Sequence, residues 1–370
     1  MITPFDDYPI HQTPVPVAHA GGGHPNHYDR YFFNGYTEDM YFAVALGLYP
    51  NRGVIDAAFS VVRGGEQRSV FASGRIPLDR TQTRIGPISV EVVEPLRTVR
   101  VYVDAPEHGL RADLVAHTRT AVAEEPRSTV HNGTQVVMDT TRATQLVRWS
   151  GDLSVAGQPV DLRSVPVYGT KDRSWGVRAL GDPVPAAPTP DKRQIFFLWA
   201  PLHFEDRCLH YLVYENADGH PWLESAAELD VLDADAPRFG PDAGIRHLGG
   251  VRHKVSWTPG LRKSKGATLT LDGDDAPIEL EPLVTFRMRG IGYRHPVWTH
   301  GRWHDELAVG GEVVPVEDLD RLSPDCFHLQ QVVRATWGKR TGIGVLEQLL
   351  IGPYHPGGWR GLTDGAPDVA

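Results

Sequence analysis

The stretch Leu96–Val103, with sequence LRTVRVYV, carries the pattern that decides the fold. In an extended chain successive side chains point to opposite faces, so Val99, Val101 and Val103 share one face. Mostly polar side chains stand between them. This alternation predicts a β-strand with one buried face, and residues 110–117 (LRADLVAH) repeat the pattern.

Short runs of the same kind recur along the whole chain. They cover residues 41–49, 54–62, 70–76, 143–149, 153–162, 193–202, 208–214, 222–231, 251–257, 267–271, 278–288, 295–307, 327–337 and 344–351. Glycine and proline number 38 and 30, which favours turns over long helices. Only residues 316–322 could form a short helix. Many short strands at this spacing predict an all-β fold of antiparallel sandwiches or barrels.

The chain has 370 residues, which is long for one ordinary hydrophobic core and favours two domains. Residues 181–191, GDPVPAAPTPD, can form neither a helix nor an unbroken strand because of their prolines. We therefore predict one β-domain with an N-terminal arm in residues 1–180, a Pro-rich linker at 181–191, and a second β-domain in residues 192–370. No sequence repeat relates the two halves.

Composition excludes several classes of partner. The net charge is −9 and no basic block occurs, so nucleic acid is not expected as a partner. No apolar window is long enough to span a membrane, and the N-terminus lacks the features of a signal peptide. Two cysteines do not make a disulfide framework. A cytoplasmic protein is expected, whereas the oligomeric state is not predictable.

The densest group of polar side chains is residues 169–178, GTKDRSWGVR. Its acid, cations and indole favour a strand that lines a pocket. Burial beside Trp175 would raise the pKa of Asp172, while Arg173 or Arg178 would lower it. Asp172 is therefore either a functional acid or one half of a structural Asp–Arg pair, and the sequence leaves both interpretations open.

Two further groups of aromatic and polar residues follow in the second half, at residues 293–306 and 337–347. If residues 293–306 are extended, Trp298, His300 and His304 share one face, whereas His295 points to the other. A metal site at these histidines is possible, but we favour hydrogen-bonded imidazoles around a polar pocket and predict no metal.

No motif for a covalent or cofactor mechanism is present. The chain lacks Gly-x-Ser-x-Gly, a dinucleotide fingerprint, a Walker loop and Cys-x-x-Cys. We therefore predict no organic cofactor. What remains is proton transfer by a carboxylic acid or an imidazole in an aromatic-lined site.

Residues 169–178 resemble the Gly-x-Arg-Asp-His-Ser-Trp-Gly-x-Arg signature of the AttH/hydroxyneurosporene synthase (carotenoid 1,2-hydratase)-like family, with Lys171 and Arg173 as departures. Residues 290–303 and 342–347, and the Tyr49–Gly53 segment, are similar to further patterns of that group. The resemblance implies a tandem of two lipocalin-like β-barrels. It also implies hydration or cyclisation of terpenoid-like or polyketide-like molecules without an organic cofactor.

Our hypothesis from the sequence is a cofactor-independent lyase or isomerase that hydrates, isomerises or cyclises an apolar isoprenoid or polycyclic molecule. Asp172 is the expected acid, and His300, Glu347 and Tyr211 are further catalytic candidates. The expected substrate-binding residues are Trp175, Arg178, Trp199, His210, Trp298, Trp303 and Trp337. The alternative is a non-catalytic lipocalin-like carrier or sensor of an apolar ligand.

Overall fold

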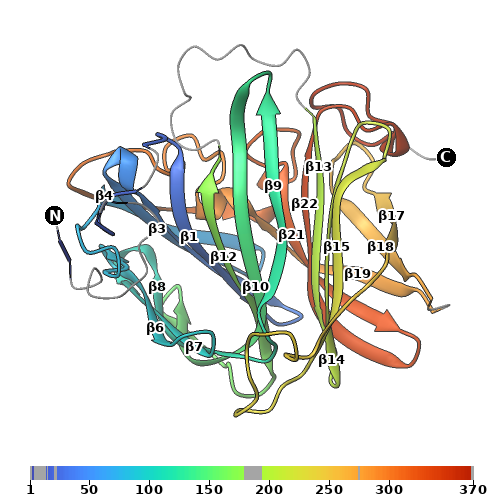
Figure 1. The fold of residues 1–370 in the computed structure, drawn as a ribbon, viewed down its shortest axis with the longest axis horizontal. Helices are drawn as coiled ribbons and strands as arrows, with labels where there is room; N and C mark the ends of the chain where they lie inside the picture. The colour runs from blue at the N-terminus through green and yellow to red at the C-terminus, as the bar shows by residue number, and fades with distance from the viewer. Residues whose placement is uncertain are drawn as a thin grey trace.

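The computed structural model describes residues 2–3, 14, 16–20, 23–178, 194–273 and 276–367. In these ranges the chain forms two curled antiparallel sheets, which confirms the predicted all-β fold of two barrel-like units (Figure 1). The helices among the described residues are short 3-10 turns, at Pro50–Arg52 (η2), Pro106–His108 (η3), Met288–Ile291 (η4), Val316–Leu319 (η5) and His355–Gly357 (η6). None of them is long and apolar enough to cross a membrane.

The first sheet has thirteen strands in the order β20-β4-β3-β2-β1-β12-β10-β8-β7-β6-β5, and β9 and β11 both pair with β10. The strands are β1 (His27–Tyr36), β2 (Met40–Tyr49), β3 (Val54–Arg63), β4 (Glu66–Arg75), β5 (Arg84–Ile85), β6 (Ile88–Glu94), β7 (Thr98–Ala105), β8 (Leu110–Thr118), β9 (Ala123–Asn132), β10 (Gln135–Val155), β11 (Gln158–Val160), β12 (Val167–Val177) and β20 (Leu307–Pro315). The 169–178 motif therefore lies on β12, between β1 and β10.

The second sheet has nine strands in the order β16-β15-β14-β13-β22-β21-β19-β18-β17. They are β13 (Ile195–His203), β14 (Arg207–Glu215), β15 (Pro221–Asp230), β16 (Ile245–His247), β17 (Val251–Trp257), β18 (Ser264–Leu271), β19 (Ile278–Arg287), β21 (His328–Trp337) and β22 (Arg340–Ile351). Figure 1 shows β13 and β22 of the second sheet on the side of the first sheet where β9 and β10 lie, and β22 contacts β12.

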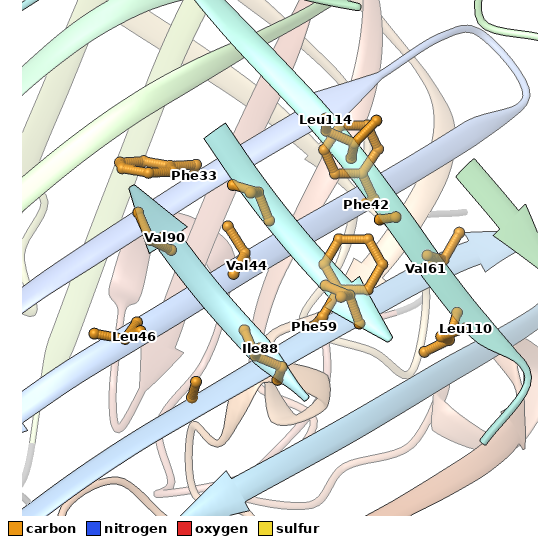
Figure 2. Packing of buried hydrophobic residues seen from close by; sticks show 14 of the residues in the cluster. Phe33, Phe42, Val44, Leu46, Phe59, Val61, Ile88, Val90, Leu110 and Leu114 are labelled. Carbon is orange, nitrogen blue, oxygen red and sulfur yellow. The ribbon is translucent and has the colours of Figure 1, made fainter. Parts of the chain in front are cut away.

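Apolar side chains fill the interior of the first sheet. Alternate residues of β1, β2 and β3, such as Phe33, Phe42 and Phe59, pack there against Ile88 and Leu114 from the strands across the interior (Figure 2). The predicted alternation of Val99, Val101 and Val103 on β7 is confirmed, because all three belong to this core. The interior of this unit is a packed core rather than a polar pocket.

The opposite face of the same strands is buried as well, against the second sheet. Phe32, Tyr41 and Ala58 of the first sheet form one cluster with Trp199 and Val345 of the second sheet. The two sheets therefore bury a second apolar layer between them. The opposing sheet removes polar side chains on this face from water, which shifts their pKa values. We therefore expect a functional site in the inter-sheet layer.

Residues 293–306 do not form the extended segment that the sequence favoured. Gly292, Arg294 and Gly301 have φ angles of 96°, 52° and 71°, which are left-handed conformations that interrupt a strand. The strand begins only at Leu307, and it joins the first sheet by pairing with β4. The predicted linker at 181–191 lies outside the described residues, so the division into domains there stays a prediction.

Candidate active site

The strand β12 turns alternate side chains of its motif to opposite faces of the first sheet. Thr170 and Asp172 face the second sheet, because Asp172 lies opposite Phe32, a member of the inter-sheet layer. Lys171, on the other face, donates a hydrogen bond from Nζ to Gln145 Oε1 at 3.0 Å. Trp175 is 41% exposed at the end of the strand. Only part of the motif therefore contributes to the inter-sheet layer.

Asp172 is a buried acid with incomplete hydrogen bonding. The residue is 8% exposed, and Arg142 Nε lies 3.6 Å from Oδ2. Oδ1 has no hydrogen-bond partner among the described residues. Burial raises the pKa of Asp172 to about 7, because the charge of Arg142 opposes it only in part and the carboxylates of Glu125 and Glu347 add to it.

Burial, which raises the pKa of Asp172, thus outweighs the neighbouring positive charge, which lowers it. The arginine closest to it is Arg142 of β10, which the sequence did not single out, rather than Arg173 or Arg178. Arg173 pairs instead with Asp29, with Nη2 2.8 Å from Oδ1.

Glu125 of β9 is the second carboxyl beside Arg142, with Arg142 Nη1 at 3.2 Å from Oε2. Its Oε1 accepts hydrogen bonds from Thr144 Oγ1 at 3.0 Å and Trp199 Nε1 at 3.2 Å, and His210 Nε2 lies 3.1 Å away. Burial would raise the pKa of Glu125, but Arg142, His210 and Thr144 outweigh it and lower the pKa to about 2. The site therefore raises the pKa of Asp172 and lowers the pKa of Glu125. Asp172 can act as an acid near neutral pH, while Glu125 stays ionised.

Glu347 of β22 is the third carboxyl. It accepts hydrogen bonds from Gln330 Nε2 and pairs with His328 Nε2, each at 2.6 Å. Burial would raise the pKa of Glu347, but His328, Arg142 and Gln330 lower it below its ordinary value. Burial lowers the pKa of His328, so the ring is neutral near pH 7. Since an ionised Glu347 can only accept, the ring proton sits on Nε2 and leaves Nδ1 as a proton acceptor.

A chain of buried amide hydrogen bonds connects Glu347 on β22 to β12. Gln330 Oε1 accepts from Asn34 Nδ2 at 2.8 Å and from Tyr41 Oη at 2.6 Å. Asn34 Oδ1 in turn accepts from the backbone nitrogen and the hydroxyl of Thr170, at 2.7 and 2.8 Å. These fully used amide groups fix the separation of the two sheets beside Asp172.

Next to His328, whose ring lies 4.4 Å from that of Tyr293, two guanidiniums and an imidazole surround Tyr293. Its Oη accepts from Arg30 Nη1 at 2.7 Å and from Arg178 Nη2 at 3.0 Å. The ring of His300 lies edge-on to Tyr293, with centroids 4.8 Å apart. We call Arg30, Arg178, Tyr293 and His300 the donor cluster.

The remaining residues expected in the site lie apart from Asp172. Tyr211 and Trp337 belong to the core inside the second sheet. Trp298 stacks on Phe71, and Trp303 is 43% exposed beneath the guanidinium of Arg75. Of the predicted residues, Glu347, Trp199, His210, Arg178 and His300 lie at the inter-sheet layer, and Trp298 packs against it.

Sequence reasoning missed Glu125, Arg142, His328, Tyr293 and Arg30 as site residues. On β10 the polar residues Thr140, Arg142 and Thr144 recur with period two, which was an available signal for a polar face. His328 and Gln330 show the same spacing, but nothing local reveals which face of a strand another sheet will cover.

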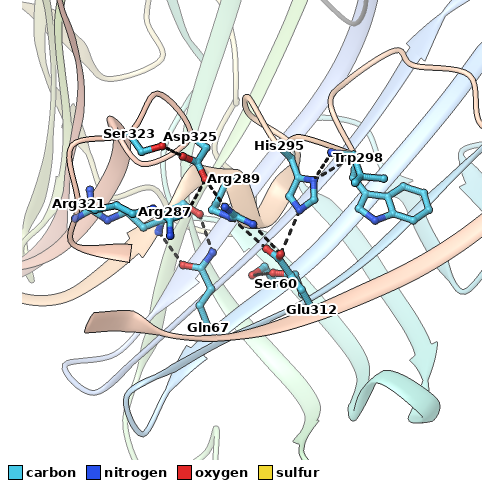
Figure 3. A network of polar contacts seen from close by, with 12 residues as sticks. Ser60, Gln67, Arg287, Arg289, His295, Trp298, Glu312, Arg321, Ser323 and Asp325 are labelled. Atoms are coloured by element: carbon cyan, nitrogen blue, oxygen red, sulfur yellow. Dashed lines mark hydrogen bonds and ion pairs between the residues drawn. The ribbon is translucent and has the colours of Figure 1, made fainter. Parts of the chain in front are cut away.

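The histidines considered for a metal serve separate purposes. His295 Nδ1 accepts from the backbone nitrogens of Val297 and Trp298, and its Nε2 lies 3.2 Å from Glu312 Oε2 (Figure 3). The same figure shows Arg289 joining Glu312 to Asp325, so His295 is part of a network that attaches η4 to β20. In the described part of the chain, no three His, Cys, Asp or Glu side chains are placed to hold a metal ion.

The two curled antiparallel sheets place this chain among barrel-like all-β proteins. Solved structures share this fold: an AttH-assigned protein of Nitrosomonas europaea has a TM-score of 0.53 at 12% identity, over 87% of this chain and 92% of that chain. Kievitone hydratase of Nectria haematococca has a TM-score of 0.52 at 12% identity, over 87% and 88%. The predicted likeness to AttH-like proteins is thus confirmed for the fold.

The chain itself belongs to a family of unknown function, DUF8625, whose model matches residues 2–360. A sequence search of curated proteins finds no significant match.

Proposed function

We propose that this protein is a lyase or isomerase that acts by acid–base catalysis on an apolar small molecule held between the two sheets. The observation that carries the proposal is Asp172, a buried carboxyl with a free Oδ1 and a pKa raised to about 7. A carboxylic acid that keeps its proton near neutral pH can donate it to carbon, whereas an ordinary aspartate cannot.

The neighbouring groups supply what such a donor requires. Arg142 lies 3.6 Å from Asp172, so it stabilises the carboxylate that remains after the proton has left. The His328–Glu347 pair provides an acceptor at Nδ1 with a carboxylate behind it, which is the arrangement of a general base. For a hydration, Asp172 protonates one alkene carbon, a water oxygen bonds to the other, and His328 takes the water's proton.

The apolar lining supports an apolar substrate. Tyr41 stacks on Phe286 at 4.5 Å, and the guanidinium of Arg142 lies over the ring of Phe197. Such rings pack against hydrocarbon skeletons. We therefore propose an isoprenoid or polycyclic substrate carrying an alkene. One structural neighbour is named as a hydratase, which agrees with this class of reaction.

Two broader expectations accompany the proposal. We propose that the protein works in the cytoplasm, since Cys208 and Cys326 are both free thiols. We also propose that each half of the chain acts as a domain, with catalysis at their junction and without an organic cofactor.

The proposal is tested by incubating the protein with a panel of isoprenoid and polycyclic alkenes in heavy water. Mass spectrometry is expected to find carbon-bound deuterium in the product, with the mass of one added water for a hydration. Asp172→Asn is expected to abolish the change. Asp139→Asn serves as the matched control, because Asp139 of β10 forms a partly exposed ion pair with Arg127 of β9.

An alkene that binds tightly but is recovered without deuterium would instead identify a carrier. Turnover that survives in Asp172→Asn would show that another group donates the proton.

A further inference from the structure

The donor cluster has more hydrogen-bond donors than acceptors. Guanidinium groups can only donate, so Tyr293 Oη accepts from both Arg30 and Arg178, and neither of them can receive the phenolic proton. Arg30 is 1% exposed, and its Nε and Nη2 have no hydrogen-bond partner among the described residues. His300 Nε2 is also buried without a partner there. The unused N–H groups of Arg30 and the phenolic O–H of Tyr293 therefore converge on one buried place.

The two guanidiniums of the cluster are not paired with any described carboxylate at close range, whereas His300 Nδ1 lies 3.9 Å from Asp56 Oδ1. In the described ranges, no carboxylate lies within ion-pairing distance of Arg30 or Arg178, although both guanidiniums lie over the ring of Tyr293. Burial would raise the pKa of Tyr293, but the two arginines outweigh it and lower the pKa below its ordinary value. A phenol in this state is a strong hydrogen-bond donor.

The local backbone holds the cluster in place. Gly292 has φ 96°, and a Cβ atom there would lie 2.8 Å from His300 Cε1, so only glycine lets the imidazole approach the turn. The N–H of Gly301 donates to Asp56 Oδ2 at 2.6 Å, which fastens the turn to β3. The donors are thus preorganised rather than free to reorient.

Arg30 of the cluster and Asp172 lie on the same face of the first sheet. Arg30 pairs with Ser174, and Asp172 is two residues further along β12 on the same face. Two residues along a strand and one strand across give a separation of roughly 8 Å between the two Cα atoms. One small molecule can therefore meet the acid at one atom and the donors at another.

We propose that Arg30, Arg178, Tyr293 and His300 bind the carbonyl oxygen of an α,β-unsaturated carbonyl substrate and stabilise the enolate oxygen formed from it. This inference deepens the proposed function and rests on it for the identity of the reacting bond. It narrows the substrate from any apolar alkene to one whose double bond is conjugated to a carbonyl group.

The electron and proton balance of the hydration is complete with the groups described. The water oxygen bonds to the β-carbon, and His328 takes its proton. The alkene pair shifts towards the carbonyl carbon, and the carbonyl pair moves to the oxygen, where the donor cluster holds the enolate. The enolate then takes the proton of Asp172 at the α-carbon. The proton held by His328 restores the acid, so one water is added overall.

The experiment uses 4-nitrophenol as the probe, because its anion carries the charge of an enolate and absorbs at a longer wavelength than the neutral phenol. Titrating the whole protein into the probe at a pH where the free phenol is neutral is expected to produce the spectrum of the anion. The methyl ether 4-nitroanisole, which cannot ionise, is expected to bind at least ten-fold more weakly. Arg30→Gln and Tyr293→Phe are each expected to weaken anion binding at least ten-fold.

Arg173→Gln is the matched control, since Arg173 lies on the opposite face of β12 and pairs with Asp29. The inference is overturned if the probe does not bind, if it binds as the neutral phenol, or if both variants bind the anion like the unaltered protein. Asp172→Asn is expected to keep the anion-binding signal. Loss of the proposed catalysis with retained anion binding would therefore be distinguished from failure of the donor cluster.

Discussion

Replacing Asp172 by asparagine is expected to stabilise the protein above neutral pH while removing its proton donor. Asparagine has nearly the same shape as aspartate but carries no charge to desolvate. The pKa of Asp172 is raised from 3.8 to about 7 in the folded protein. The native state therefore holds the proton more tightly than the unfolded chain does, and ionisation of this group destabilises the fold.

The sign and size of the effect follow from this shift. A raised carboxyl pKa contributes stability that is complete below pH 3.8 and is lost as the pH rises through 7. A shift of roughly three units, at about 1.4 kcal/mol each, corresponds to about 4 kcal/mol above pH 7. Arg142 loses one partner in the variant but keeps Glu125 at 3.2 Å, which reduces the expected gain to about 2–4 kcal/mol.

The assay is chemical denaturation of the unaltered protein and the variant at a series of pH values. The difference in unfolding free energy is expected to be largest at pH 8 and to shrink as the pH falls towards 4. Asp139→Asn is the control of opposite sign, because the hydrogen bonds from Arg127 lower the pKa of Asp139. That variant is expected to lose about 0–1 kcal/mol at pH 8. A folded Asp172→Asn protein that is no more stable at pH 8 would refute the reasoning.

Further outcomes follow from the same geometry. Turnover is expected to fall as the pH rises above about 7, because ionisation of Asp172 removes the acid, and a pH–rate profile measures this. Glu347→Gln is expected to lower kcat by about 10²–10⁴-fold, as measured by steady-state kinetics with an identified substrate. Cys208 is expected to resist thiol reagents until the protein unfolds, because burial raises the pKa of its thiol to about 12. Gly310→Val is expected to cost about 1–3 kcal/mol in a denaturation assay, since the added side chain would overlap the ring of Trp298.

The sequence was sufficient to predict the strands, and it named Asp172 as a candidate site residue. The alternation of Val99, Val101 and Val103 reflects a local property of the chain, since side-chain direction changes at every residue of a strand. Asp172 was found because an acid among cations and an indole is unusual within a strand. These signals are contained in a few consecutive residues, so they need no knowledge of the distant chain.

Glu347 was named as a candidate from its own segment, but Arg142 and Glu125 were not. The convergence of these three residues on Asp172, from three other strands, depends on strand order and on the packing of one sheet against another. The segment at 293–306 was misjudged because its aromatic and polar residues resemble a strand, whereas Arg294 and its neighbouring glycines adopt left-handed conformations. Pairing of β20 with β4 joins residues far apart in the chain, which no local pattern encodes.

The central claim is that Asp172 holds a proton near neutral pH in the layer between the two sheets. It is tested most directly by following the side-chain carboxyl ¹³C signals of labelled protein as a function of pH, with Asp172→Asn identifying the resonance. The account predicts a titration with a midpoint near 7. A midpoint at or below the ordinary value of 3.8 would show a permanently ionised partner of Arg142 and would contradict it.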